Sequence, residues 1–152
     1  MYGDTEVLRR RVDQLREQAV DIRGLADQLV ARTESTGWTG RAADSMRVRV
    51  TERATHLRGA AAQHETAAEA LEKHVHEVEA LQEQIADVEK RATDLVAEAR
   101  TRVADVERRN ADADADATGV RVEPDPDDVV LCAFEAPPAG HRDWLDVELP
   151  GL

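Results

Sequence analysis

The sequence predicts an all-α fold in which two antiparallel helices form a hairpin and the second helix is much longer than the first. Three observations predict it. Apolar residues recur at alternating spacings of three and four along most of the first 106 residues, and a glycine-containing turn interrupts the repeat once. Only 3% of the 152 residues are aromatic, whereas 34% are charged. This combination is typical of long helices and coiled coils rather than of a mixed globular core.

The first helix is expected from about Asp4 to Glu34. Asp4 or Thr5 can cap its start, because either side chain accepts a hydrogen bond from a free backbone N–H. Gly37 can adopt the left-handed conformation that ends a helix. The apolar positions follow a heptad repeat of about three heptads, formed by Leu8, Val12, Leu15, Ala19, Ile22, Ala26 and Leu29.

The second helix is expected to begin after Gly40 and to continue to about Asn110. The first part of its repeat consists of Met46, Val50, Ala54, Leu57, Ala61, His64, Ala68, Leu71, Val75 and Val78. The next apolar residue, Leu81, follows Val78 by three positions instead of four. The repeat then resumes at Ile85, Val88, Ala92, Leu95, Ala99, Val103 and Val106. This phase shift predicts a local change of supercoil, or a bend, near residues 78–82.

The two helices differ in length, so the first helix can cover the second only to about residue 75. The apolar positions from Val75 to Val106 then lack a partner within the hairpin, although such residues are expected to be buried. The simplest expectation is that a second chain covers them. The alternative is a break near residues 78–82 that lets the distal part fold back.

The composition changes after residue 110. Residues 111–128 are predicted to be an acidic linker, because alternating Asp and Ala lead into Glu123-Pro124-Asp125-Pro126. Residues 129–152 form a tail, either docked on the helices or disordered, and its Val129–Phe134 run favours a β conformation. The predicted organisation is therefore a hairpin domain over 1–110, a linker over 111–128 and a tail over 129–152.

Charge and composition exclude several classes of function. The net charge is −12, unevenly spread: residues 1–58 hold 11 basic and 9 acidic groups, residues 59–118 hold 7 and 15, and residues 119–152 hold 2 and 8. This acidic balance disfavours nucleic-acid binding, which needs a clustered basic surface. No apolar run has the roughly 20 residues of a membrane span. The N-terminal residues do not read as a cleavable signal peptide.

No residue pattern indicates catalysis, a cofactor or a metal. His74 and His76 are two positions apart on the second helix and point to different sides, so with His64 they do not make the converging ligand set that zinc needs. His64 occupies a position of the apolar repeat, where it can act as a buried polar residue that fixes the register. Cys132 has no evident base near it and is best explained as a small apolar residue.

The turn between the helices is the most specific motif. Gly37 and Gly40 can adopt backbone conformations that other residues avoid, and Trp38 is large enough to close the open end of a two-helix interface. A W-x-G triplet near residue 40 between long amphipathic helices favours a binding protein built on a helical hairpin. The alternative is an ordinary turn with an incidental tryptophan.

Three features belong together: the apolar repeat from Leu8 to Leu29, the turn Gly37-Trp38-Thr39-Gly40, and the residues Ala42, Ala43, Met46 and Val50 that follow it. In these features the chain resembles the WXG superfamily, the small ESAT-like proteins of type VII (ESX) secretion. The resemblance covers about residues 4–90. It implies a hairpin that pairs into a four-helix bundle, as a homodimer or as a heterodimer with a related hairpin protein. It also implies export without a cleaved signal peptide, in Gram-positive bacteria that are often actinobacteria.

The chain departs from this family in its longer second helix, its tail and its export motif. The family's Tyr-x-x-x-Asp/Glu motif is missing, since the only tyrosine is Tyr2; Trp144 and Glu148 keep the spacing with tryptophan instead. They are the candidate export motif.

The leading functional hypothesis is a non-enzymatic type VII secretion substrate or export partner, made in the cytoplasm and secreted, with a secretion ATPase or a larger effector as further partners. It would act through helix pairing at Leu8, Val12, Leu15, Ile22, Leu29, Met46, Val50, Leu57, Leu71, Val78 and Ile85. The alternative is a coiled-coil adaptor, or a targeting chaperone for a larger secreted effector, that stays in the cytoplasm.

Overall fold

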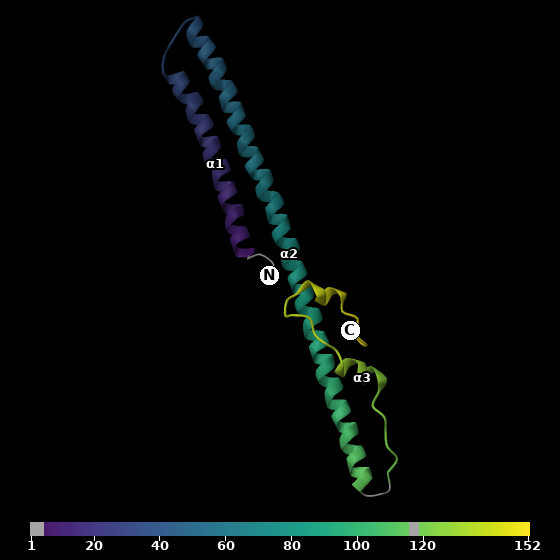
Figure 1. The fold of residues 1–152 in the computed structure, drawn as a ribbon. Coiled ribbons are helices and arrows are strands. Elements are labelled where there is room, and N and C mark those ends of the chain that lie inside the picture. The colour runs from purple at the N-terminus through teal and green to yellow at the C-terminus, as the bar shows by residue number, and fades with distance from the viewer. Residues whose placement is uncertain (1–4, 116–118) are drawn as a thin grey trace. The chain divides into compact units, whose positions relative to one another are not determined.

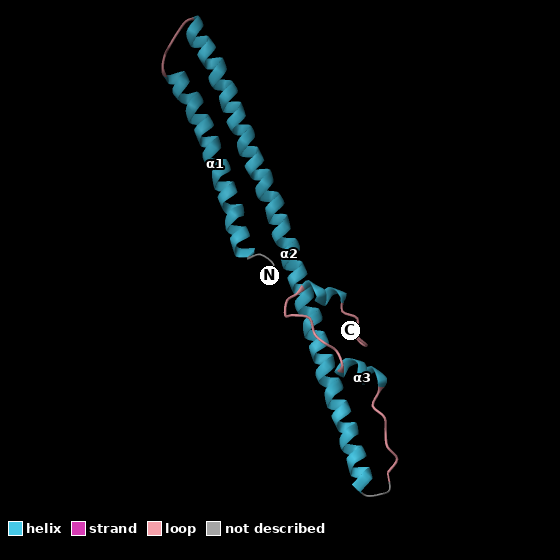
Figure 2. Cartoon of the chain, in the orientation of Figure 1, coloured by secondary structure: helices cyan, strands magenta, loops and turns pink. Residues whose placement is uncertain are grey.

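The computed structural model describes residues 5–115 and 119–152, and the regular secondary structure within them is all helical. Its elements are α1 (Thr5–Ser35), α2 (Arg41–Ala115), the short α3 (Pro126–Cys132) and a 3-10 helix (Arg142–Asp146) (Figures 1 and 2). No strand occurs among the described residues. The predicted all-α class, with a second helix much longer than the first, is confirmed. The expected cap Asp4 lies outside the described residues.

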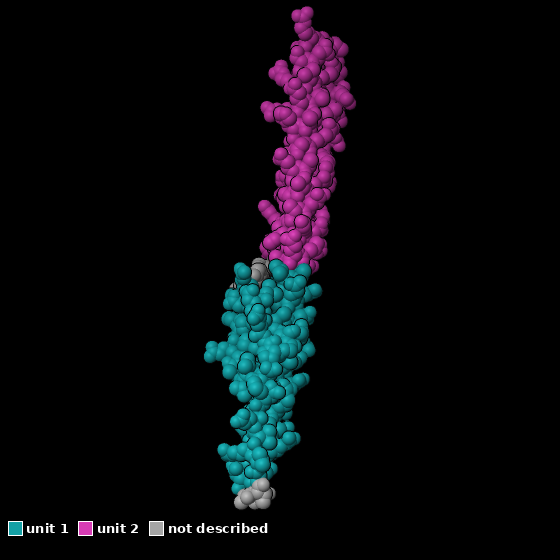
Figure 3. All heavy atoms as spheres, turned by 90° about the vertical axis from the view of Figure 1, so that its right-hand side faces the viewer, with its two compact units in different colours: residues 1, 80–152 teal, residues 2–79 magenta. Residues whose placement is uncertain are grey.

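The chain divides into two compact units, which Figure 3 colours separately. One contains residues 2–79, which hold α1 and the first part of α2. The other contains residues 80–152 together with residue 1. Each unit has its own buried residues, so each part of α2 is covered by a different segment.

The unit of residues 2–79 is the predicted helical hairpin, in which α1 lies beside α2 (Figure 1). The centre of the contact is made of small side chains that recur every seventh residue. On α1 these are Val12, Ala19 and Ala26, and on α2 they are Ala54, Ala61, Ala68 and Val75; the five alanines have no exposed surface. Small residues at one heptad position allow two helix backbones to approach closely, because no long side chain stands between them.

Helix α2 runs without a break through residues 78–82 and ends later than expected. The Ala-Asp run was predicted to fray into a linker from residue 111, but Ala111–Ala115 still belong to the helix. Residues 116–118 of the predicted linker lie outside the described residues. Residues 119–125 contain no regular element, as expected for a proline-rich acidic connection.

In the unit of residues 80–152, the C-terminal segment 126–152, here called the strap, packs against α2. Ile85 and Ala92 are buried with Trp144, and Val96 and Ala99 are buried with Leu131. Partly buried residues complete these clusters: Val88, Leu95, Cys132, Phe134, Val147, Leu149 and Leu152. The tail is therefore docked. The expectation that a second chain, or a fold-back at residues 78–82, must cover the distal apolar positions is wrong for this stretch.

The prediction of a β conformation at Val129–Phe134 is also wrong, because most of this run lies in α3. Asp125 caps the helix, its side chain accepting a hydrogen bond from the Asp127 backbone N–H at 2.9 Å. Pro126 stands at the first helical position, where it removes no needed hydrogen bond. Asp128 and Leu131, three residues apart, face α2 and are buried. Capping and docking thus outweigh the β preference of Val129 and Val130.

Candidate interaction surface

The turn of the hairpin places its tryptophan in solvent. Gly37 and Gly40 have φ of 64° and 101°, in the region that favours glycine. Trp38 is 66% exposed, and its carbonyl oxygen accepts a hydrogen bond from the Arg47 guanidinium. In the hairpin taken alone, the indole therefore closes no interface, and it is free to contact another molecule.

One side of the hairpin, here called the ionic face, is closed by ion pairs between the two helices. Three arginines on α1, seven residues apart, meet three glutamates on α2 with the same spacing. The three pairs are Arg9–Glu79 at 2.6 Å, Arg16–Glu72 at 2.8 Å and Arg23–Glu65. In a fourth pair, at 2.7 Å, the arginine is on α2 and the carboxylate on α1: Arg58–Asp27. Because each step of seven along α1 matches a step of seven back along α2, the pairs and the buried alanines share one antiparallel register.

Two of these pairs are bidentate and shift the acidity of their carboxylates. Both terminal guanidinium nitrogens of Arg16 donate hydrogen bonds to the Glu72 carboxylate, at 3.2 and 2.8 Å. Both terminal nitrogens of Arg23 donate in the same way to Glu65. The pKa values of Glu65 and Glu72 are lowered, mainly because these hydrogen bonds stabilise the ionised carboxylates.

The lowered pKa values make the hairpin sensitive to acid. A carboxylate whose pKa is lower in the folded state stabilises the fold above its unfolded pKa, about 4.3 for Glu, and this stabilisation is lost as the pH falls through the folded pKa. We expect the Tm, followed by circular dichroism, to fall more steeply below about pH 4 for the native chain than for the variant Glu65→Gln/Glu72→Gln. Parallel pH profiles of the two proteins would contradict this assignment. Since these side chains are partly exposed to solvent, salt should weaken the effect.

The opposite side of the hairpin is here called the apolar face, and among the described residues no ion pair joins the helices there. Its inner row comes from the heptad positions three residues after the buried alanines, on the side away from Glu65 and Glu72. Most side chains of this row are half-buried, so a partly exposed apolar stripe runs along the hairpin: Leu8, Leu15, Ile22, Leu29, Leu57, His64, Leu71 and Val78.

The predicted pairing residues fall into four groups. Val12 and Val50 are buried inside the hairpin, whereas most of the others line the apolar face. Met46 is 46% exposed beside that face. Ile85 belongs to the other unit and packs against the strap. The buried alanines were part of the predicted repeat, but their central role was missed; the signal for it is their recurrence at a single heptad position.

His64 is the histidine of the inner row of the apolar face. Its Nδ1 is buried without a hydrogen-bond partner among the described residues. His74 is exposed, and His76 lies 3.8 Å from Glu79 on the same helix. The described residues contain no group of three or more His, Cys, Asp or Glu side chains arranged for a metal. None of the described helices is both long and apolar enough to cross a membrane.

The candidate export motif lies in the strap, with its tryptophan in the core. Trp144 is 2% exposed, donates from Nε1 to the Pro138 carbonyl at 3.0 Å, and has its ring centroid 6.1 Å from that of Phe134. Glu148 is exposed four residues later. In this conformation the indole holds the strap on α2, and only the glutamate is presented to solvent.

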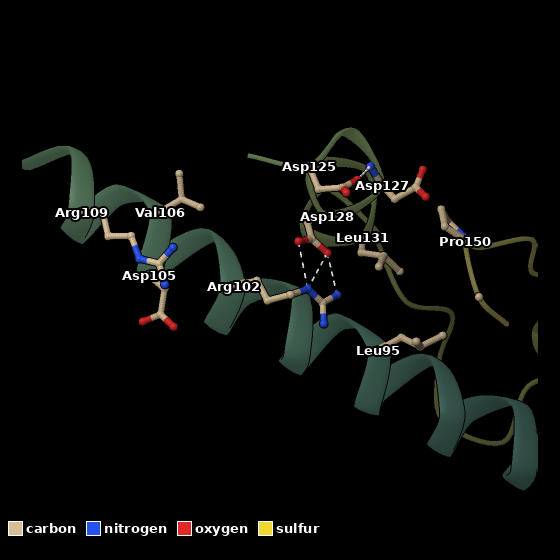
Figure 4. A pocket seen from close by; sticks show the side chains of 11 residues that line it. Leu95, Arg102, Asp105, Val106, Arg109, Asp125, Asp127, Asp128, Leu131 and Pro150 are labelled. Atoms are coloured by element: carbon tan, nitrogen blue, oxygen red, sulfur yellow. Dashed lines mark hydrogen bonds and ion pairs between the residues drawn. The ribbon is translucent and has the colours of Figure 1, made fainter. Parts of the chain in front are cut away.

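A cleft of about 530 Å³ lies between α2 and the strap (Figure 4). Its central contact is the Arg102 guanidinium, which donates to both carboxylate oxygens of buried Asp128, with contacts from 2.6 to 3.0 Å. These hydrogen bonds lower the pKa of Asp128 and raise that of Arg102. Asp125, also at the cleft, caps α3. The groups that dominate the cleft thus bind one another, and their role is to hold α3 on α2.

The geometry defines a helical-hairpin protein with one ionic face, one apolar face and an exposed tryptophan at its turn. The family model described as "Putative T7SS secretion signal domain" matches residues 1–130, which include the whole hairpin, all of α2 and most of α3. The chain therefore belongs to this family of type VII secretion signal domains. No curated protein and no solved structure matches it.

Proposed function

We propose that this chain is a non-enzymatic substrate of a type VII secretion system, and that its hairpin is the part by which it is taken up for export. The observation that carries the proposal is the family match, which spans the hairpin with its open apolar face. An export signal of this kind acts by being bound, so it needs a surface that the fold leaves free rather than a catalytic site. The apolar face and exposed Trp38 supply such a surface.

The same features support a pairing mechanism and a place in the WXG superfamily. The glycine-bounded turn with Trp38 fits that superfamily, and the apolar face suits a second helical hairpin, which would complete a four-helix bundle. In this account the protein is made in the cytoplasm, pairs with a related hairpin and is secreted without a cleaved signal peptide. A secretion ATPase or a larger effector is a further proposed contact.

Export can be tested directly by expressing the epitope-tagged chain in a bacterium with an active type VII system. We expect the chain in the culture supernatant of the parent strain and its retention in cells of a strain that lacks the secretion ATPase. A cytoplasmic protein released by the same lysis in both strains is the control. Retention in the parent strain would contradict the proposal and favour the cytoplasmic adaptor or targeting chaperone.

Replacing Trp38 with alanine is expected to reduce export without weakening the chain itself. The indole is 66% exposed, so its removal leaves no cavity in the hairpin, and the Tm of the purified chain should change little. Secretion should fall because a large aromatic contact with the export partner is lost. The matched control is Val48→Ala, an exposed apolar residue on the ionic side of α2. Equal secretion of the Trp38 variant and the native chain would contradict a role of Trp38 in export.

A further inference from the structure

Among the described residues, the formal charges beside the apolar face are all positive. The outer row of this face on each helix consists of the residues that directly precede the buried heptad positions. It contains Arg11 and Arg32 on α1 and Arg53 on α2. No Asp or Glu occupies the inner or outer rows among the described residues of the hairpin. Carboxylates are instead plentiful on the ionic face, where Glu65, Glu72 and their neighbours lie. The apolar stripe is therefore flanked by a basic rim, formed by Arg11, Arg32 and Arg53.

Two of these arginines also have no ion-pair partner among the described residues. Arg32 and Arg53 are exposed and make no ion pair among the described residues, whereas the arginines of the ionic face are all matched to carboxylates. Arg11 donates only to Gln14, a neutral side chain, at 3.2 Å. Unpaired arginines along an apolar stripe are suited to fix the identity of a partner, because such flanking charges set partner choice in paired helices.

We propose that the apolar face binds a separate amphipathic helical protein whose apolar stripe is flanked by Asp and Glu, and that it does not bind a second copy of this chain. This inference rests on the proposed function, since it specifies the partner of the hairpin. An acidic flank on the partner would meet Arg11, Arg32 and Arg53. A second copy would bring the same three arginines, and the described part of its rim holds no carboxylate, so the two rims would repel rather than attract.

The shape and charge of the chain favour a helix over a lipid surface. Most apolar side chains of the inner row are half-buried and recur at heptad spacing along two antiparallel helices, a pattern that matches the ridges of another helix. The net charge of −12 also repels anionic lipid at long range. Binding to anionic vesicles is therefore an outcome that would overturn the proposal.

The test uses the full chain and two fluorescently labelled synthetic helices about four heptads long, matched to α1. Both carry the same Leu and Ile stripe; one has Glu at the flanking positions and the other has Lys. We expect the Glu-flanked helix to bind at least about ten times more tightly by fluorescence anisotropy in about 0.1 M salt. The total charge of −12 opposes this preference, so finding it would locate the cause in the basic rim.

Variants of the rim make the test specific. Arg32→Glu/Arg53→Glu should invert the preference, and the neutral Arg32→Gln/Arg53→Gln should reduce it, with far-UV circular dichroism unchanged because both arginines are exposed. The matched control, Arg10→Glu/Lys73→Glu, makes the same charge change on exposed positions away from the apolar face and should keep the native preference. A control variant that also inverts the preference would contradict a local role for the rim.

Three results would overturn the proposal: equal or no binding of the two helices, a dimer of the chain in light scattering that the Arg32→Glu/Arg53→Glu variant abolishes, or binding to phosphatidylglycerol vesicles without a peptide preference. Export separates this inference from the proposed function. A clear preference in a chain that is not secreted would leave the inference standing and remove the proposed function. A secreted chain without the preference would do the reverse.

Discussion

Replacing Trp144 with alanine is expected to release the strap from α2 and to lower the free energy of unfolding of residues 80–152 by about 3–5 kcal/mol, the usual cost of removing a buried aromatic side chain. The indole is 2% exposed, packs with Ile85, Ala92 and Phe134, and donates a hydrogen bond to the Pro138 carbonyl. Its loss leaves a cavity where the strap packs on α2, and it removes one of the two hydrogen bonds that the Pro138 carbonyl accepts; the other comes from the His141 backbone N–H.

Amide hydrogen exchange measures this effect locally. Protection should fall across the strap and across the α2 residues from about 85 to 99, while α1 and the hairpin keep theirs, because the two units have separate buried clusters. The neighbouring Leu145→Ala removes an apolar side chain that is 42% exposed and serves as the control. Unchanged protection of the strap in the Trp144 variant would show that Trp144 does not hold it.

Replacing Ala68 with leucine is expected to destabilise the hairpin by about 1–3 kcal/mol, because overpacking a close contact forces the backbones apart. Ala68 has no exposed surface and lies between Glu65 and Glu72, the two residues that make bidentate ion pairs with α1. Separation of the helices would stretch those pairs as well. The loss should therefore exceed what the intrinsic helix preference of leucine, close to that of alanine, would produce.

Thermal unfolding followed by circular dichroism measures the change, with Ala62→Leu as the matched control. Ala62 lies on the same helix and is exposed, so the same substitution there adds no atoms to the contact. A lower Tm for the Ala68 variant alone is the expected result. Equal Tm values for the two variants would mean that the alanine contact is not closely packed.

The heptad repeat predicted the hairpin, its unequal helices and the glycine-bounded turn, since each of these follows from local spacing. It also located the shift at Leu81, and the structure supplies the reason: the boundary between the two units falls between residues 79 and 80. Before that boundary α2 packs on α1 through Ala61 and its heptad equivalents, and after it on the strap through Ile85 and Ala92. The change of repeat accompanies a change of partner segment.

The strap itself could not be predicted, because its docking depends on contacts that are distant in sequence. The buried pair Arg102–Asp128 and the placement of Trp144 against Ile85 have no local signature. The cap of α3 was readable in principle, since Asp125-Pro126 is a good helix start, but the three β-branched or apolar residues after it favoured a strand. The division of the hairpin into an ionic face and an apolar face could not be predicted either, because it depends on which side of α1 packs beside which side of α2.

The seven-residue spacing of the hairpin has a consequence for how its alignment is fixed. If α1 were displaced along α2 by one heptad away from the turn, Ala19 and Ala26 would again meet small residues of the repeat, and Arg16 and Arg23 would again meet glutamates. A displacement in the opposite direction would instead bring Arg23 to Arg58, so the repeating part of the interface distinguishes poorly between the native alignment and the first of these neighbours only. The short connection between Ser35 and Arg41 opposes that displacement, because it requires about 10 Å of additional chain. Alignment in this protein is thus set by loop length, and lengthening the loop by a heptad would permit two competing folds of nearly equal energy.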